Sequence, residues 1–255
     1  MGLMPLRNRL CLVLDLDQTL LDTKFHKLSP EEQTSLSNSP IKNDLYSWNS
    51  KTRGDTYLTK LRPCVRKFLH EASKLYEMYV YTHGTRSYAR TMVRFLDPHG
   101  IYFGSRILSK EDSTMNGQKG LDVVPVNKTC VVILDDTENV WATSDRSNLM
   151  VIKRYYFFDT RNGTRSLCQE GMDESVCAGP LSRALGLLQQ VHKSYFQRYN
   201  IFGEELLGIL LDRNGIHRQK LQGIKDGKPL CDGGSRKRKR GNDGCPSATA
   251  SKRAK

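Results

Sequence analysis

Two pairs of aspartates in this sequence have the residue types and the setting that phosphoryl transfer needs. Asp15 and Asp17 directly follow an apolar run at residues 10–14, and Asp135 and Asp136 follow a second run at residues 131–134. In an extended segment alternate side chains share a side, so Asp15 and Asp17 are expected to point the same way. One carboxylate of such a pair can attack phosphorus and form an aspartyl-phosphate. The other can give a proton to the leaving group and then take one from water.

The same aspartates have the oxygen ligands that Mg²⁺ prefers in proteins. If the two apolar runs are strands of one parallel sheet, their carboxyl ends border the crevice in which such sheets bind ligands. A lone D-x-D pattern is weak evidence, because pairs of surface aspartates are common. The alternative is that each pair caps a following helix, which explains one pair well and both together poorly.

Short apolar runs alternate with amphipathic segments along the chain. Runs at residues 10–14, 78–81, 131–134 and 149–152 favour strands buried on both faces, although pattern alone does not exclude a helix. Apolar spacing predicts helices over residues 65–75, after Pro63, and over residues 85–96. A further helical region begins at Pro180 and is expected to extend to about residue 222. This order predicts an α/β fold in which helices cover both faces of a mostly parallel sheet.

A polar segment at about residues 23–56 interrupts this pattern and is predicted to be an insertion, either a small hairpin or a partly mobile loop. Tyr46 and Trp48 are its aromatic features. They either contact a peptide substrate or anchor the insertion to the body of the protein, and the second interpretation is favoured.

Composition narrows the class of protein. The chain has 255 residues, 38% hydrophobic and 26% charged, which is typical of a folded globular protein. It has no apolar stretch long enough to span a membrane, and Asp15 ends the first apolar run too early for a secretory signal. Seven cysteines without any C-x-x-C pair predict neither a zinc site nor a disulfide framework, as is typical of the cytosol or nucleus.

The net charge of +13 is uneven, because residues 235–255 hold eight Lys or Arg and one Asp, which accounts for +7. The mildly basic body suits a polyanionic partner such as a phosphoprotein or a nucleic acid. The basic run at residues 236–240, with Lys252 and Arg253 beyond it, resembles a bipartite nuclear localisation signal. A solvated tail and a nucleic-acid-binding arm are the alternatives. We expect one folded domain at residues 1–222 and a disordered basic tail at residues 223–255.

Six sequence blocks, in this order, resemble the haloacid dehalogenase superfamily, and specifically the FCP-type phosphatases that act on the carboxy-terminal domain (CTD) of RNA polymerase II. The resemblance covers roughly residues 10–158. It implies a Rossmann-like haloacid dehalogenase fold and a Mg²⁺-dependent phosphatase that acts on phosphoserine through an aspartyl-phosphate. The blocks are DLDQT (15–19), KLRP (60–63), YTHGTRSYA (81–89), DP (97–98), QKGL (118–121) and DDTENVW (135–141).

The resemblance also assigns catalytic roles. Asp15 matches the nucleophile, and Asp17 matches the general acid and base, with its backbone carbonyl on the metal. Thr82 matches the residue that hydrogen-bonds a phosphoryl oxygen. Lys119 matches the cation that neutralises the phosphate and orients the nucleophile.

The remaining roles concern the metal and the substrate. Asp136 matches the direct metal ligand. Asp135 matches the residue that positions Lys119 or a metal-bound water. The implied metal site therefore comprises both acidic pairs. Thr19 is expected to orient the loop that binds substrate. Arg62 and Asp97 match substrate-binding positions of the polymerase-tail branch. Alternatively, Arg62 only starts a helix and Asp97 only ends one.

Substrate choice depends on what covers the site. The 36 residues between Thr82 and Lys119 leave no room for a large cap, and the insertion lacks the apolar periodicity of a lid. We therefore expect an open cleft that admits a peptide. The residues after Gly223 are too few for the BRCT module of longer relatives, which leaves recruitment open.

Together these features predict a nuclear phosphatase of the polymerase tail. Transcription factors are possible partners, and no membrane contact or nucleic-acid binding beyond the basic tail is expected. The alternatives are a phosphatase of another phosphoprotein or of a small phosphate, and a non-catalytic nuclear binding module.

Overall fold

The computed structural model describes residues 8–25, 28–37, 42–50, 54–158 and 165–202. All of them belong to a unit that spans residues 1–222. The expected basic tail at residues 223–255 and the helical region beyond residue 202 lie outside the described residues.

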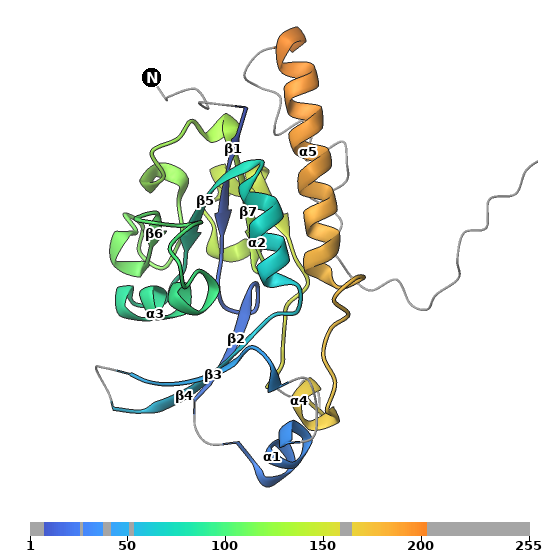
Figure 1. Cartoon of the computed structure of the whole chain (residues 1–255). Coiled ribbons are helices and arrows are strands. Elements are labelled where there is room, and N and C mark those ends of the chain that lie inside the picture. The colour runs from blue at the N-terminus through green and yellow to red at the C-terminus, as the bar shows by residue number, and fades with distance from the viewer. Residues whose placement is uncertain (1–7, 26–27, 38–41, 51–53, 159–164, 203–255) are drawn as a thin grey trace, which may run out of the picture. The chain divides into compact units, whose positions relative to one another are not determined.

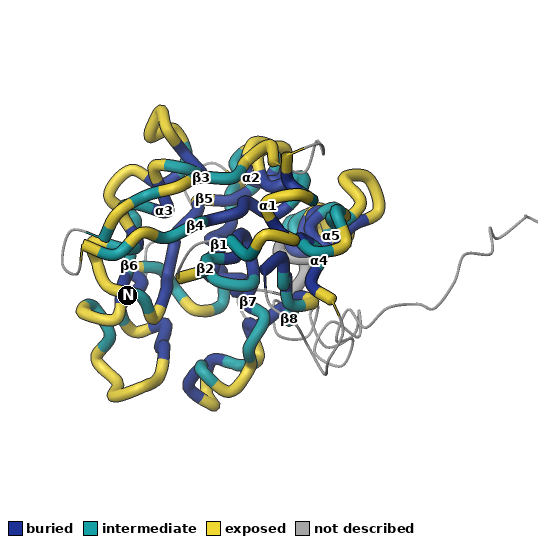
Figure 2. Tube along the Cα trace, turned by 90° about the horizontal axis from the view of Figure 1, so that it is seen from below, coloured by how far each residue is buried: buried dark blue, intermediate teal, exposed yellow. Residues whose placement is uncertain are grey.

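A five-stranded parallel sheet forms the centre of this unit, and its strands lie in the order β6-β5-β1-β7-β8 (Figure 1). The strand predictions are confirmed, except that β5 begins two residues earlier than expected and the two-residue β6 was not predicted. Every residue of β1 and β7 is buried, as the continuous apolar runs require (Figure 2). The strands are β1 (Leu10–Leu14), β5 (Tyr76–Tyr81), β6 (Ile107–Leu108), β7 (Val131–Asp135) and β8 (Leu149–Val151).

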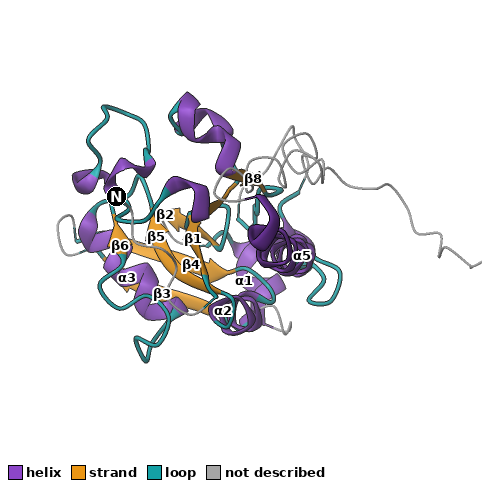
Figure 3. Ribbon diagram, turned by 90° about the horizontal axis from the view of Figure 1, so that it is seen from above, coloured by secondary structure: helices purple, strands orange, loops and turns teal. Residues whose placement is uncertain are grey.

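Three α-helices, α2 (Val65–Ser73), α3 (Arg86–Leu96) and α5 (Pro180–Phe202), share one hydrophobic cluster with one face of the sheet (Figure 3). The apolar side of each helix is the one that its residue spacing predicted, whereas the sequence did not predict that all three helices would cover the same face of the sheet. Short 3₁₀ helices, among them η3 (Leu121–Val123) and η5 (Glu138–Val140), border the second cluster, on the opposite face. The expected Rossmann-like haloacid dehalogenase fold is thereby confirmed, with tight turns in place of α-helices on the second face.

The described part of the insertion contains more regular secondary structure than its polar composition predicted. Strands β2 (Leu21–Phe25), β4 (Thr56–Leu61) and β3 (Leu45–Asn49) form an antiparallel sheet in that order, and the helix α1 (Pro30–Ser37) packs with α4 (Leu167–Glu170). The ring of Tyr46 stacks on Phe95 of α3, with centroids 4.5 Å apart, so this tyrosine anchors the insertion. A largely polar sequence is compatible with a sheet here because one face packs on α3, while Leu45 and Leu58 on the other face pack against the buried cluster that contains Leu36.

Within the described residues, no helix is both long enough and apolar enough to cross a membrane. The cysteines in the described ranges, Cys11, Cys64, Cys130, Cys168 and Cys177, are all free thiols.

Candidate active site

The three central strands end at the same edge of the sheet, and each delivers one group of predicted site residues there. In the sheet β1 lies between β5 and β7. After β1 the chain adds β5 and β6 on one side of it and then β7 and β8 on the other, so the strand order reverses at β1. Asp15 follows β1, Thr82 follows β5, and Asp135 is the last residue of β7. Ligands bind at this kind of position in open parallel sheets, because the connections diverge there and leave a crevice.

A tight turn holds Asp15 and Asp17 at the end of β1. The backbone N–H of Asp15 still donates to the Leu134 carbonyl of β7, at 3.0 Å, so Asp15 keeps the position of a strand residue. The fully buried Leu16 then anchors the turn, because its carbonyl accepts the backbone N–H groups of Thr19 and Leu20. Gln18 adopts the left-handed region at φ 61°, which lets the chain reverse.

Lys119 bridges the two strand ends. Its Nζ donates to Asp15 Oδ1 at 2.6 Å and to Asp135 Oδ2 at 2.8 Å. All three side chains are buried, at 8% exposure or less. The indole of Trp141 donates to the same Asp135 oxygen at 2.9 Å. A lysine that the sequence placed only by resemblance therefore lies between the two acidic pairs.

These charges shift one another's protonation. Burial and the neighbouring Asp135 carboxylate raise the pKa of Asp15 well above its usual value, and Lys119 opposes that shift. Burial alone would lower the pKa of Lys119, but the carboxylates of Asp15 and Asp135 outweigh it and raise that pKa. The raised pKa favours the charged form of Lys119.

Asp15, Asp135 and Asp136 form a candidate cation site. Each offers one carboxylate oxygen, and these oxygens lie within 4.8 Å of one another. These three carboxylates concentrate negative charge, and Lys119 is the buried cation that contacts them. Their oxygen atoms are the hard donors that suit Mg²⁺. The residues present therefore fit the predicted metal. Arg154 closes one side of the site, because its Nε lies 2.6 Å from Asp136 Oδ2.

Asp17 lies outside that group of three carboxylates and has its own partner. The phenol of Tyr88, on α3, donates to Asp17 Oδ1 and also lies 3.1 Å from the hydroxyl of Thr23. Burial raises the pKa of Asp17 to about 6, against the opposing effects of Tyr88 and Lys119. A carboxyl group with such a pKa can both give and take a proton near neutral pH. The predicted metal contact through its backbone carbonyl stays a prediction.

Thr82 lies at the end of β5 with a buried side chain, where its Oγ1 accepts the backbone N–H of Gly84 at 3.0 Å. Gly84 is required by space. A Cβ atom built on it would lie 2.4 Å from Tyr88 Cδ1 and 3.3 Å from Thr82 Oγ1. This glycine allows α3 to bring Tyr88 close to the strand ends. The role predicted for Thr82, as a hydrogen-bond partner of a phosphoryl oxygen, stays a prediction.

Thr19 and Arg62 support the turn from behind. The Thr19 hydroxyl lies 3.4 Å from Asp136 Oδ1, and its carbonyl accepts from Arg62 Nη1 at 2.9 Å. Arg62 is 1% exposed and forms a two-pronged ion pair with Glu174, at 2.7 and 2.9 Å. In this arrangement Arg62 positions the turn through Thr19. The predicted substrate contact of Arg62 stays a prediction.

Asp97 has structural partners. Its carboxylate accepts the backbone N–H groups of Ile101, Tyr102 and Phe103 at 2.8 to 3.0 Å. It caps the end of α3, about 14 Å along the helix axis from Tyr88. These contacts favour the alternative in which Asp97 ends a helix, and the described structure does not bring it to the other site residues.

The described residues that contact the site but were not predicted include Tyr88, Trp141, Arg154 and Glu174. Tyr88 and Trp141 lie within two of the six sequence blocks, but no pattern linked them to a particular carboxylate. Arg154 follows β8 and Glu174 lies between α4 and α5, so only the tertiary fold brings them near the strand ends.

A parallel sheet with an acidic crevice and a bridging lysine defines a protein of the haloacid dehalogenase fold. The family model for the NLI interacting factor-like phosphatases matches residues 10–170, so this chain belongs to that family.

Named relatives agree with this family. The chain is 42% identical over 232 residues to RNA polymerase II C-terminal domain phosphatase-like 4 of Arabidopsis thaliana, which covers 86% of this chain and 52% of the relative. It is 31% identical over 221 residues to RNA polymerase II C-terminal domain phosphatase-like 3 of the same plant, covering 79% of this chain and 18% of that protein. The chain thus spans about half the length of the first relative and less of the second.

A solved structure has the same fold. The structure of Fcp1, an essential RNA polymerase II CTD phosphatase, superposes with a TM-score of 0.62 over 84% of this chain and 68% of that one, at 24% identity. At this identity the likeness supports the fold alone.

Proposed function

We propose that this chain is a Mg²⁺-dependent protein serine/threonine phosphatase that hydrolyses phosphoserine in the CTD of RNA polymerase II through an aspartyl-phosphate. The observation that carries the proposal is the contact of Lys119 with Asp15, at 2.6 Å, and with Asp135, at 2.8 Å, at adjoining strand ends. A lysine buried between carboxylates is suited to hold a phosphate dianion against a carboxylate nucleophile.

In the first half of the reaction, Asp15 attacks phosphorus. One bond forms between an Asp15 oxygen and phosphorus, and the bond between phosphorus and the serine oxygen breaks. Asp17 gives its proton to that departing oxygen, so serine leaves as a neutral hydroxyl. Lys119 and Thr82 bind the phosphoryl oxygens, on which negative charge remains throughout.

In the second half, water replaces the peptide. Asp17, now a carboxylate, takes a proton from this water as its oxygen attacks the phosphorus of the aspartyl-phosphate. The bond between Asp15 and phosphorus breaks, inorganic phosphate leaves, and Asp15 is again a carboxylate. The hydrogen bond from Tyr88 keeps Asp17 in one place for both proton transfers.

Mg²⁺ would be held by Asp15, Asp136 and the Asp17 backbone carbonyl, with Asp135 beside it, and would neutralise charge on the transferring phosphoryl group. Without it the three clustered carboxylates would repel a phosphate dianion, since Lys119 and Arg154 together supply only two positive charges.

The names of the relatives support the choice of substrate, and the basic run at residues 236–240 supports a nuclear location. Transcription factors remain proposed partners. The proposal is tested with the full chain and Mg²⁺ by comparing kcat/KM on CTD heptad peptides, each phosphorylated at a different serine, with kcat/KM on unrelated phosphopeptides and small phosphates. A clear preference for heptads is expected. Equal or faster hydrolysis of a small phosphate would instead indicate a metabolite phosphatase.

A further inference from the structure

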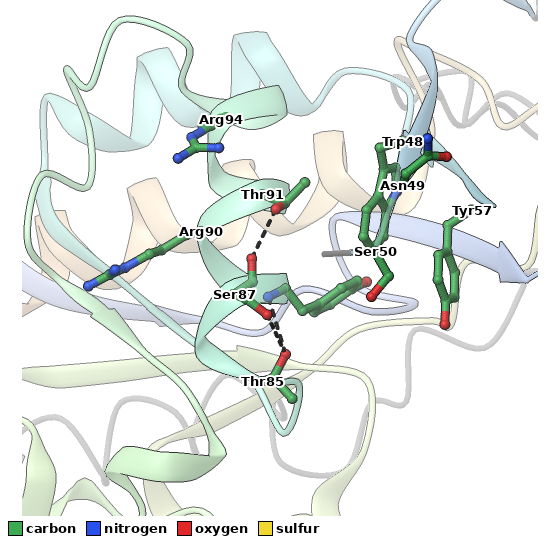
Figure 4. A pocket seen from close by; sticks show the side chains of 10 residues that line it. Trp48, Asn49, Ser50, Tyr57, Thr85, Ser87, Arg90, Thr91 and Arg94 are labelled. Atoms are coloured by element: carbon green, nitrogen blue, oxygen red, sulfur yellow. Dashed lines mark hydrogen bonds between the residues drawn. The ribbon is translucent and has the colours of Figure 1, made fainter. Parts of the chain in front are cut away.

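A groove beside the active site has no role in the chemistry described so far. It lies between the insertion and α3 and has a volume of about 510 Å³ (Figure 4). Trp48 and Tyr57 stand on one side of it, and α3 forms the other (Figure 4). Its lining residues are Trp48, Asn49, Ser50, Tyr57, Thr85, Ser87, Tyr88, Arg90, Thr91 and Arg94.

The aromatic side of the groove is held in place. Trp48 stacks on Tyr57 with ring centroids 4.7 Å apart, and its ring also lies 5.9 Å from that of Tyr88. The Trp48 indole donates to the buried Thr59 hydroxyl at 2.9 Å. Trp48 therefore both anchors the insertion, as the sequence favoured, and offers a fixed aromatic surface to a chain lying in the groove.

Tyr88 connects this groove to the catalytic centre. Its ring lines the groove, while its phenol donates to Asp17, the proposed proton donor to the leaving group. The leaving group of a phosphoprotein substrate is the serine of its own chain. The substrate serine is therefore expected to lie next to Asp17. The peptide residues that flank this serine then lie beside the groove.

The helical side of the groove has uncompensated positive charge. Arg86, Arg90 and Arg94 follow one another at intervals of one helical turn on α3, and all are exposed. Arg86 pairs with Asp112 at 2.7 Å, whereas Arg90 and Arg94 have no acidic partner in the described part of the chain. Like charges at this spacing destabilise a helix. Arg94 complements the helix dipole at the last turn, but Arg90, at mid-helix, has no such compensation.

The Arg90 and Arg94 side chains extend from α3 on the side that faces away from Trp48 and Tyr57 (Figure 4), and both contribute to the groove lining. Long, exposed arginine side chains without an acidic partner are available to bind an anion. A guanidinium group can donate two parallel hydrogen bonds to one phosphate.

We propose that Arg90 and Arg94 bind a second phosphate of the same phosphopeptide whose first phosphate is hydrolysed at Asp15. This inference rests on the proposed function and narrows its substrate to multiply phosphorylated chains. Helix rise places Arg90 and Arg94 about 3 to 9 Å along α3 from Tyr88. An extended peptide advances roughly 3.3 Å per residue. The second phosphate is therefore expected about one to three residues from the scissile one.

The test compares full-chain protein on three synthetic peptides in the presence of Mg²⁺. One peptide has a single phosphoserine, and the other two add a second phosphoserine three residues before it or after it. The Arg90→Ala, Arg94→Ala double variant is compared with a Lys67→Ala, Lys193→Ala variant, which removes the same charge from exposed positions on α2 and α5. Thermal unfolding of both variants verifies that α3 and the fold persist.

We expect the wild type to prefer one of the doubly phosphorylated peptides by about tenfold in kcat/KM, with the preference weakening at high salt. The arginine variant should lose most of that preference, and the lysine variant should keep it. Equal rates on all three peptides, or a preference that survives in the arginine variant, would overturn the inference and leave the proposed function standing. A wild type that hydrolyses neither phosphopeptides nor an aryl phosphate would overturn both.

Discussion

At the scale of single residues, the site depends on charge balance around Lys119. Its ammonium group compensates two carboxylates, Asp15 and Asp135, that are themselves almost fully buried. Removing one partner from a buried charge cluster costs far more than removing an exposed charge, because the remaining charges have neither water nor a counter-ion. Lys119 is therefore expected to contribute more to the free energy of unfolding than Asp15 does.

We expect Lys119→Met to abolish hydrolysis and to lower the free energy of unfolding by about 3 kcal/mol, since two buried carboxylates lose their cation. Asp15→Asn should abolish hydrolysis but cost much less stability, because Lys119 keeps Asp135 as a partner. Phosphopeptide turnover and urea unfolding of both variants in metal-free buffer measure the two effects. An equally stable Lys119→Met protein would show that Lys119 is not the counter-charge of this cluster.

Tyr88→Phe removes the hydrogen bond to Asp17 while keeping the ring that lines the groove. We expect kcat on a phosphoserine peptide to fall about tenfold and KM to change little, because proton transfer to a serine oxygen needs a well-placed acid. An aryl phosphate should be less affected, since its leaving group departs readily without a proton. An equal loss on both substrates would argue against a role for Tyr88 in placing the acid.

Whether the site role of a residue could be predicted from the sequence depends on whether local sequence or tertiary packing sets its position. Asp15 and Asp135 were predictable because each ends an apolar run, and parallel strands bring such ends together. Lys119 stands in a loop, where only its resemblance to a known block indicated a role. Tyr88 and Arg154 could not be assigned, since their partners Asp17 and Asp136 are set by how α3 and the segment after β8 pack.

At the scale of elements, the tight connection between β5 and α3 controls how closely the helix approaches the site. Thr85 begins α3 by accepting the backbone N–H of Tyr88, and Gly84 leaves room for the Tyr88 ring. A single added methyl group on Gly84 would displace the start of α3, the Tyr88 ring and, through their hydrogen bond, the carboxyl group of Asp17.

Gly84→Ala is accordingly expected to lower kcat and to destabilise the protein by about 1–3 kcal/mol, the usual cost of overpacking. The matched change Gly186→Ala, in α5, meets no atom within 4 Å and should stabilise the protein by roughly 0.5–1 kcal/mol through better helix propensity. Thermal unfolding and phosphopeptide kinetics of both variants test this. A Gly84→Ala protein with wild-type kcat would show that this contact is not needed.

The strands and helices of the central layer were predictable because each buries a continuous or periodic apolar surface. The antiparallel sheet of the insertion was not, because its residues are polar and its order comes from contacts such as Tyr46 on Phe95. Likewise, the 3₁₀ helices on the second face are too short for their sequences to show a periodic apolar pattern.

At the scale of the whole molecule, a bound cation should couple the site to the stability of the fold. Lys119 and Arg154 do not fully neutralise the three clustered carboxylates, and an ion that binds only the folded state stabilises it by mass action. We expect millimolar Mg²⁺ to raise the Tm of the wild type by a few degrees and chelation to abolish hydrolysis reversibly. Asp136→Asn should lose most of the Tm response, and an unchanged response would exclude Asp136 as a ligand.

The most direct test of the central claim is the turnover of Asp15→Asn on a phosphoserine peptide with saturating Mg²⁺. The matched control is Asp44→Asn, the same chemical change at an exposed aspartate whose left-handed backbone asparagine also tolerates. If Asp15 is the nucleophile, its variant remains folded and has no measurable turnover, while the control keeps wild-type kcat. Wild-type turnover by Asp15→Asn would contradict the assignment of Asp15 and the mechanism built on it.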